Sequence, residues 1–365
     1  MSGATPPVGV VRQPRLRLLA NGMPLPWPIQ AMVRQTNTWT AATWSAEAAL
    51  KPPDPLNAAW WSAQANVEIE IQIALDGVTF QSLLIGVIDE IEIAPDEGLL
   101  TISGRDLTAL LIDQKISNAY QNQTASEIAT LLAQAAGLTP VVTATTTPVG
   151  QFYTYDHVRM ALGDLEHAIT EWDLLVYLAQ QSGYDVFVEG RSLYFQPPTA
   201  AKAPTFTVNW SAPGGVSTSN VIGLNMRRSL TLAKNVEVTV KSWHSGRRYP
   251  TVVRISSSPV NAPNGGLGPK QSYVFYKANL TPAQATAYAN AKMAAITRHE
   301  RVIDFSLPLE LSLTPRGIVQ LTGTGTAFDQ LYYPDEIERS IHARHGTSQT
   351  VTARNHSPVQ QTVLY

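Results

Sequence analysis

Residues 67–77 read VEIEIQIALDG and indicate the fold class more clearly than any other stretch of the chain. Polar and apolar residues alternate strictly over the first seven positions, so the Val and Ile side chains share one face of a β-strand. Asp76 and Gly77 then supply the residues of a tight hairpin turn. Two further runs, at 79–93 and 99–103, continue the pattern. We therefore predict an antiparallel meander.

The strand pattern extends toward the N-terminus less regularly. Asn21 and Gly22 follow a short alternating run at 15–18 and predict another hairpin. The Pro-, Trp- and Ala-rich residues that come next are mostly irregular, with short strands expected near 32–35 and 44–50.

Two helices with clear start signals follow the meander. Thr124 and Glu127 fit a capping box, in which the threonine hydroxyl and the glutamate carboxylate each accept a backbone N–H at the helix start. Thr170 caps a second helix, which ends at Gly183. The expected buried stripes are Ile128, Leu131, Leu132 and Ala135 in the first helix, and Trp172, Leu175, Val176 and Leu178 in the second. A tight turn at 189–191 then joins two more strands.

A second β-rich region begins after the boundary marked by Pro197, Pro198 and Pro204. It runs from about residue 205 to 276 and precedes a helix that Thr281 caps. Further strands are expected at 303–311, 318–321 and 348–353. The chain is therefore predicted to be mainly β, in a β-rich α+β class.

The composition limits the classes of function that this protein can have. A chain of 365 residues is longer than a single core usually supports, so two or more domains are expected. Only 15% of the residues are charged and the net charge is −2, which disfavours capture of DNA or an anionic membrane. Without cysteine, neither disulfides nor thiolate catalysis is possible. Neither a signal peptide nor a membrane span is recognisable, so we expect a soluble protein made in the cytoplasm.

Catalytic and metal-binding signatures are absent from the sequence. The seven histidines are scattered. His342 and His345 would face opposite sides if they lay on a strand, so a solvated strand or turn is favoured over a metal site. Acid pairs such as Asp89 and Glu90 are better explained by solvated strand faces than by glycoside hydrolysis. The glycine run at 322–326 lacks the Lys of a phosphate-binding loop and is interpreted as a loop between strands. We expect no enzymatic activity, no cofactor and no metal.

The candidate site is a subunit interface, for which the residues are Trp60, Trp61, Arg227 and Arg228. The Trp-rich stretch at 39–61 might suggest a carbohydrate platform, but large aromatics more often fill cores and interfaces. The Arg pairs at 227–228 and 247–248 are the best candidates for nucleic-acid contact. They lack interleaved aromatics, however, and acids balance them over the whole chain, so interface salt bridges or solvated loops are favoured.

Three stretches carry a resemblance to a known family. The first is ISGRDLTALLID at 102–113, a strand, Gly-Arg-Asp and short helix, followed by the capped helix and its Gly-Leu exit at 122–138. The second, at 171–188, is a helix, then Gly-Tyr, then a strand. The third, at 314–333, contains TPRGIVQL and FDQLYY. In this order the stretches resemble the baseplate hub family of contractile-tailed phages, which includes the late control protein D group and the hub of phage Mu.

The resemblance implies a homotrimeric ring, to which each chain contributes two barrel-like, tube-type domains with inserted and peripheral α/β elements. The expected parts are a flexible arm at 1–14, a first barrel-like domain at 15–113, an α+β insertion at 114–204, and a second barrel-like domain at 205–365 with a helix near 281–298. The implied partners are the tail spike, tail tube, baseplate wedge and tape measure proteins. The ring would lie in the baseplate of the virion, assembled in the host cytoplasm, with DNA only in transit and no membrane contact.

Two other functions stay open at this point. One is a carbohydrate-active tail protein, either a lectin or a peptidoglycan hydrolase. The other is a hexameric tail-tube or distal-tail adaptor protein, which differs from a hub in the number of subunits.

Overall fold

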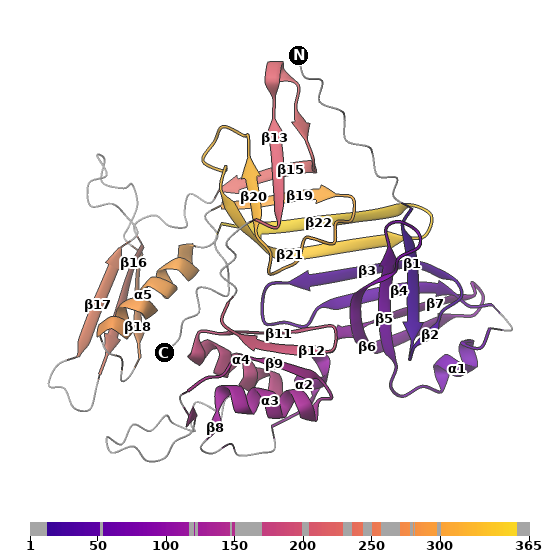
Figure 1. Ribbon diagram of the computed structural model, residues 1–365, viewed down its shortest axis with the longest axis horizontal. Helices are drawn as coiled ribbons and strands as arrows, with labels where there is room; N and C mark the ends of the chain where they lie inside the picture. Colours follow the sequence, from indigo (N-terminus) through magenta and orange to yellow (C-terminus); the bar gives the residue numbers. More distant parts are fainter. Residues whose placement is uncertain are drawn as a thin grey trace. The chain divides into compact units, whose positions relative to one another are not determined.

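The computed structural model describes residues 13–51, 54–116, 120, 123–146, 148–149, 170–198, 204–228, 236–243, 250–256, 271–277, 280, 282–297 and 301–355. Two compact units are distinguished. The first contains Met1–Val33, Ala42–Leu107 and Arg339–Ser348, and the second contains Arg34–Ala41, Thr108–Glu338 and Gln349–Tyr365. The predicted mainly β class is confirmed (Figure 1). The predicted arm at 1–14 lies outside the described residues except for its last two.

The first unit is built on an antiparallel sheet. Its strands are β1 (Arg15–Ala20), β2 (Met23–Pro24), β3 (Pro28–Thr36), β4 (Thr43–Ala49), β5 (Glu68–Ala74), β6 (Gln81–Ala94) and β7 (Leu99–Asp106). They lie in the order β3-β4-β7-β6-β5-β1-β2. A short helix, α1 (Ala58–Ser62), which the sequence did not predict, precedes β5. The meander of β5, β6 and β7 and its two turns are confirmed.

The hairpin at Asn21 and Gly22 has the backbone that its sequence requires. Both residues have positive φ, at 48° and 78°, as a two-residue turn of this class demands. Beyond it, Leu25 donates to the carbonyl of Leu18 in β1, and Trp27 accepts from Ala49 at the end of β4. One short segment therefore bonds to two different strands of the sheet.

Gly86 and Gly104 lie against the ring of Trp44 in the core of this unit. Trp44 pairs across β4 and β7 with Gly104, and its indole N–H donates to the carbonyl of Arg105 at 3.1 Å. A Cβ on Gly104 would collide with the carbonyl oxygen of Val87, and one on Gly86 would collide with that of Arg105. Only glycine therefore fits at these two positions, first because of the neighbouring carbonyl oxygens and second because of the Trp44 ring.

The β5–β6 turn is held by a carboxylate, which predicts a pH dependence. Asp76 accepts from the Thr79 side chain and from the backbone N–H groups of Val78 and Thr79, and these bonds lower its pKa from 3.8 to about 2. A lowered carboxyl pKa contributes stability above pH 3.8, and this is lost as the pH falls toward 2. We expect Asp76→Asn to lose this pH dependence, which thermal unfolding between pH 5 and pH 2 would measure against the wild type; an unchanged slope would contradict it.

An α+β region begins the second unit. Its elements are α2 (Ala109–Asp113), β8 (Gln123–Thr124), α3 (Ala125–Ala135), β9 (Thr139–Val142), β10 (Pro148–Val149), α4 (Glu171–Ser182), β11 (Asp185–Glu189) and β12 (Ser192–Gln196). The sheet order is β11-β12-β9, and α3 and α4 pack against it (Figure 1). Both predicted caps are confirmed, because Thr124 and Thr170 form capping boxes with Glu127 and Asp173.

The predicted buried stripe of α3 is partly wrong. Leu131 is 44% exposed and Ala135 is exposed, whereas Ile128 and Leu132 are buried together with Ala125, Ala129 and Ala133. The small alanines allow α3 to approach β9 and β12 closely, so the buried face is rotated toward them. In α4, Val176 is half-buried, while Trp172, Leu175 and Leu178 are buried as predicted.

A second sheet region completes the unit around its own core. Its strands are β13 (Phe206–Ser211), β14 (Thr218–Ser219), β15 (Ile222–Arg228), β19 (Arg301–Leu307), β20 (Val319–Thr322), β21 (Leu331–His342) and β22 (Gly346–Arg354), with a 3-10 turn at Pro213–Gly215. The core includes Val208, Phe305, Leu321, Tyr332 and Val351. The chain at 218–228 pairs with β13 at its start and with β19 at its end. The pairings of the described strands do not close into a barrel.

Strand β21 was not predicted from the sequence. The buried side chains of β21 stand at even-numbered positions up to Pro334 and at odd-numbered positions from Ile337 onward. Such a shift by one residue is typical of a β-bulge, where proline is tolerated. We infer a bulge at Asp335 and Glu336 from this burial pattern. It interrupts the alternation of polar and apolar residues, so no strand is recognisable here from the sequence.

A small α/β module lies between β15 and β19 in the sequence. It consists of β16 (Val236–Ser242), β17 (Thr251–Ser256), β18 (Gln271–Tyr276) and α5 (Pro282–Thr297). The sheet order is β17-β16-β18, and α5 covers one face of the sheet (Figure 1). The predicted cap Thr281 lies outside the described residues. Within the described parts of the chain, no helix is long and apolar enough to cross a membrane.

Candidate functional site

The two tryptophans predicted for an interface lie on α1 in the first unit. Asn57 caps this helix by accepting from the Trp60 backbone N–H at 3.1 Å. Trp61 is only 1% exposed, and its indole N–H donates to the carbonyl of Leu56. Trp60 is half-buried and meets Trp61 edge to face, with ring centroids 4.8 Å apart. Trp61 thus packs within its own chain, and Trp60 presents the more accessible ring.

The two predicted arginines lie at the end of β15 and are both exposed. Arg227 forms an ion pair with Asp304 at 3.0 Å, and 64% of its side chain is accessible. The tryptophans belong to the first unit and the arginines to the second.

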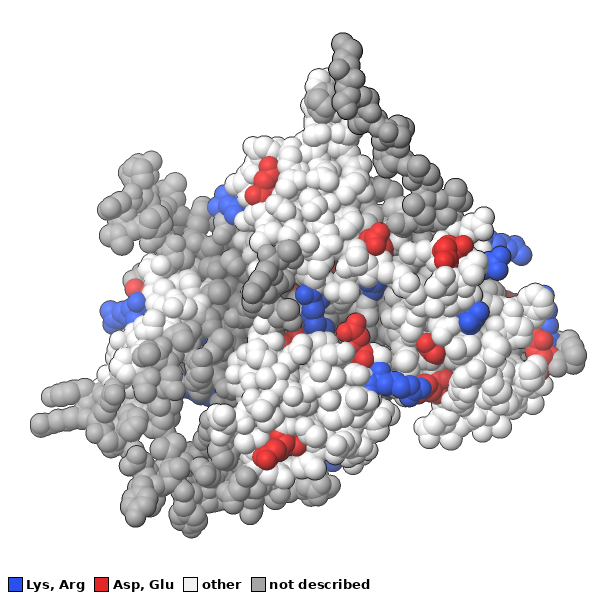
Figure 2. All heavy atoms as spheres, viewed as in Figure 1, with Lys and Arg blue, Asp and Glu red and all other residues white. Residues whose placement is uncertain are grey.

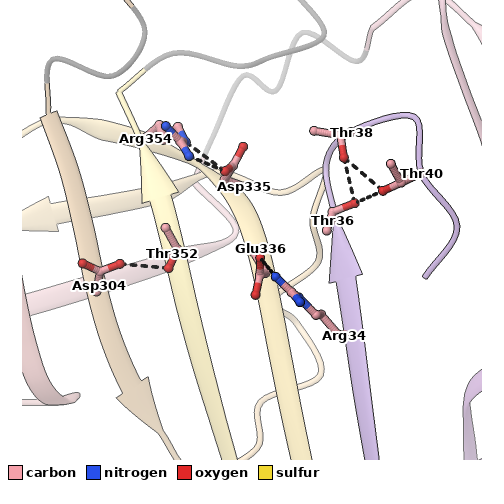
Figure 3. Close-up of polar contacts among 9 residues, drawn as sticks. All are labelled: Arg34, Thr36, Thr38, Thr40, Asp304, Asp335, Glu336, Thr352 and Arg354. Carbon is pink, nitrogen blue, oxygen red and sulfur yellow. Dashed lines mark hydrogen bonds and ion pairs between the residues drawn. The ribbon is translucent and has the colours of Figure 1, made fainter. Parts of the chain in front are cut away.

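Arg227 begins a row of polar contacts that crosses the second sheet region. Asp304 on β19 also accepts from the Thr352 hydroxyl on β22 at 2.8 Å. Figure 3 shows Asp304 and Thr352 side by side on adjacent strands. Next to Thr352, Arg354 donates from Nε and from its terminal nitrogen to Asp335, both at 2.8 Å. Cross-strand pairs of this kind fix the register of a sheet.

The row continues to the end of β3 through the bulge in β21. Glu336, adjacent to Asp335, accepts from Arg34 at 2.7 Å, and this hydrogen bond raises the pKa of Arg34. The following loop places the hydroxyls of Thr36, Thr38 and Thr40 within 2.8–3.1 Å of one another (Figure 3). The sequence could not indicate these pairs, because Arg34 and Glu336 are 302 residues apart.

A second ion pair is much more deeply buried. Asp185 on β11 accepts from Arg316 Nε at 2.8 Å, with only 6% of the Asp185 side chain accessible. The Arg316 guanidinium lies 3.7 Å from the ring centroid of Phe187, which in turn stacks on Tyr194 at 4.7 Å. This cluster connects the α+β region to the loop that precedes β20.

The other sequence signals that might suggest chemistry are internally satisfied. Asp89 pairs with Arg105 through two 2.7 Å hydrogen bonds. The glycine run is a loop between β20 and β21, as predicted. Its Thr324 and Gly325 N–H groups donate to Asp329, so the loop binds a carboxylate of its own chain.

His342 and His345 lie at a turn, in agreement with the expected solvated strand or turn. His342 ends β21, and the chain then turns, so that the His345 ring lies 4.2 Å from it instead of on the opposite side. His342 Nδ1 accepts from the backbone of both Arg344 and His345. Among the residues with described positions, no three metal-ligating side chains gather. His157, His167, His244, His299, His356 and the Arg pair at 247–248 lie outside the described residues.

The exposed surface is largely uncharged on the face drawn in Figure 2, in agreement with the 15% of charged residues. The ion pairs that join charged side chains of the described residues include Arg34–Glu336, Arg105–Asp89, Arg227–Asp304, Arg316–Asp185 and Arg354–Asp335. Such an arrangement can hold a sheet in register and leave exposed arginines for a partner, but it contains no nucleophile, base and oxyanion donor in mutual contact.

Comparison with solved structures shows that the chain has the fold of several phage tail proteins. Residues 66–221 match the family model described as the Alg8 N-terminal domain, which is less than half of the chain and does not place it in that family. No curated protein matches the chain. The 43 kDa tail protein of prophage MuSo2 from Shewanella oneidensis aligns with a TM-score of 0.66 and 15% identity, over 95% of this chain and 99% of its own.

Two further solved structures are similar over nearly their whole length. The tail protein from Neisseria meningitidis MC58 has a TM-score of 0.67 and 15% identity, over 96% of this chain and 99% of its own. The prophage tail protein gp18 from Listeria monocytogenes EGD-e has a TM-score of 0.57 and 9% identity, over 96% and 97%. A chain of the Francisella PdpA-VgrG complex matches at a TM-score of 0.55 and 10% identity, with 96% of this chain and 59% of that one covered. The expected resemblance to phage tail proteins is confirmed at the level of the fold.

Proposed function

We propose, from the premise that this chain has the fold of phage tail proteins, that it is a structural baseplate hub subunit. In this role a homotrimeric ring joins the tail tube to the central spike and forms the channel for the tape measure protein and DNA. The proposal rests on the structural similarity to three tail proteins, which covers 95–96% of this chain and 97–99% of those chains.

The internal architecture supports this proposal. Each sheet region contains one segment that bonds to two different strands, at residues 23–27 in the first and at 218–228 in the second. A segment that turns a corner in this way allows a sheet to curl. We therefore infer two barrel-like, tube-type domains per chain, so that three chains present six such domains to a hexameric tube.

The spike is the partner that this proposal requires most directly. A PdpA-VgrG complex is among the structures of this fold, which favours a spike-type partner for the present chain. The tail tube, wedge and tape measure proteins are further proposed partners. Trp60, Arg227 and Arg228 stay our candidates for direct subunit contacts, and the buried Trp61 supports the Trp60 ring from within the chain. Although Arg227 pairs with Asp304, 64% of its side chain is accessible to a partner. We propose no catalytic activity and a place in the virion baseplate.

The oligomeric state tests the hub proposal directly. Light scattering on the purified protein is expected to give three times the chain mass of 39.7 kDa, and one trimeric spike is expected to bind per ring. A hexamer would instead support a tube or distal-tail adaptor. A monomer that ignores the spike and clears cell walls in zymography would support the carbohydrate-active alternative.

A further inference from the structure

Basic residues are concentrated in one part of the chain, between residues 227 and 298. This stretch contains eleven of the 26 Lys and Arg residues but a single acid, Glu237. The acids that balance the arginines over the whole chain therefore lie elsewhere. The near-neutral net charge conceals a strongly basic region, which includes the module of β16, β17, β18 and α5.

One face of the sheet in this module is covered by its own helix. Val236, Val238 and Val240 of β16 form a core with Ala285 and Ala289 of α5. Because side chains alternate along a strand, Lys241 of β16 belongs to the opposite face. The residues paired with it in β17 and β18, Val252 and Tyr276, share that face.

This opposite face of the β16–β18 sheet, hereafter the open face, combines exposed aromatic and basic side chains. Tyr276 is 72% exposed, and the Lys241 ammonium lies 5.7 Å from its ring centroid. Arg254, paired with Thr239, is also exposed. Trp243 directly follows β16 and is 59% exposed. Large aromatics left this accessible on a small sheet indicate a binding surface.

We propose that the open face, through Lys241, Trp243, Arg254 and Tyr276, binds single-stranded nucleic acid. Single-stranded nucleic acid is recognised by cationic side chains that follow the phosphates and by aromatic rings on which unpaired bases stack. The local excess of positive charge complements a polyanion. An acidic protein segment or an anionic membrane would also be attracted by the basic side chains. The accessible aromatic rings beside them favour nucleic acid, because unpaired bases can stack on these rings. This inference goes beyond the hub function, in which DNA only passes through the channel and no site is required to bind it.

Fluorescence anisotropy of the full chain with labelled oligo(dT) of about 20 nucleotides tests the proposal, since such a probe exceeds the footprint of one small module. The double variant Trp243→Ala with Tyr276→Ala is expected to bind at least about tenfold more weakly, because each lost stacking ring weakens binding by about this order. Lys241→Gln with Arg254→Gln is expected to reduce the dependence of affinity on salt by up to about one unit of slope.

A matched control is present in the first unit. Trp27 is 47% exposed and has the Lys51 ammonium 4.1 Å from its ring, but it lies outside the basic region. Trp27→Ala and Lys51→Gln are therefore expected to leave oligo(dT) binding unchanged. All these side chains are at least partly exposed, and equal melting temperatures would confirm that the variants fold.

Three results would overturn the proposal. One is that duplex DNA binds as tightly as oligo(dT) and that the aromatic variants have no effect, which would mean that the protein contacts only phosphates. Another is binding to phosphatidylglycerol vesicles without binding to oligo(dT). The third is equally tight binding of polyglutamate that depends on the same residues. None of these results changes the oligomer mass, so a failure here is distinguishable from a failure of the hub proposal.

Discussion

Gly104→Ala is expected to destabilise the first unit by about 3 kcal/mol, at the upper end of overpacking effects. The added Cβ would collide with the carbonyl oxygen of Val87 on β6 and approach Trp44 Cζ2 to 3.0 Å. Because the Val87 carbonyl oxygen is a backbone atom, no change of side-chain rotamer relieves the collision, and β6 must move away from β7. Chemical denaturation followed by tryptophan fluorescence would measure the loss.

Two further variants separate the reasons for this loss. Gly22→Ala places a Cβ in open space at a positive φ of 78°, so its expected loss is only about 1 kcal/mol from backbone strain. Trp44→Phe combined with Gly104→Ala is not expected to restore stability, since the carbonyl of Val87 stays in place. Full recovery in that double variant would show that ring contact, and not strand separation, is the cause.

Arg316→Ala is expected to destabilise the second unit by about 2 kcal/mol, below the usual effect of breaking a buried ion pair because Arg316 is itself one-quarter exposed. The variant leaves the Asp185 carboxylate buried, and its Oδ1 atom has no hydrogen-bond partner among the described residues. It also removes the guanidinium that stacks on Phe187. Arg316→Lys keeps the charge without the planar stack and is expected to lose less.

The exposed pair of Arg34 and Glu336 is the matched control for this effect. Its 2.7 Å separation is as short as that of the buried pair, but 55% of the Arg34 side chain is accessible. We expect Arg34→Ala to lose at most about 1 kcal/mol in the same unfolding measurement. Equal losses for Arg34→Ala and Arg316→Ala would mean that burial does not determine the strength of these pairs.

The sequence could indicate which types of residue form the candidate interface, but not which of their side chains are accessible. Large aromatics and paired arginines are typical of subunit contacts, and the sequence supplies both. It could not indicate that Trp61 is buried against its own chain while Trp60 is accessible, since this depends on how α1 packs. The local excess of basic residues can be counted in the sequence, but the exposure of Trp243 and Tyr276 beside them depends on how the sheet and its helix pack.

Features that depend on neighbours a few residues away were predictable from the sequence. The hairpin turns at Asn21 and Asp76, the capping boxes at Thr124 and Thr170, and the alternation of β5 were all predictable in this way. The physical reason is that a turn dihedral or a capping hydrogen bond is satisfied within four residues.

Features that join distant residues could be recognised only in the folded chain. Glycine is required at Gly86 and Gly104 because carbonyl oxygens of the neighbouring strand, those of Arg105 and Val87, lie where a Cβ would stand. The face of α3 that is buried depends on its approach to β9 and β12, and the bulged strand β21 depends on partners such as Arg34 and Arg354. These features follow from packing and pairing between segments up to 302 residues apart, which no local pattern encodes.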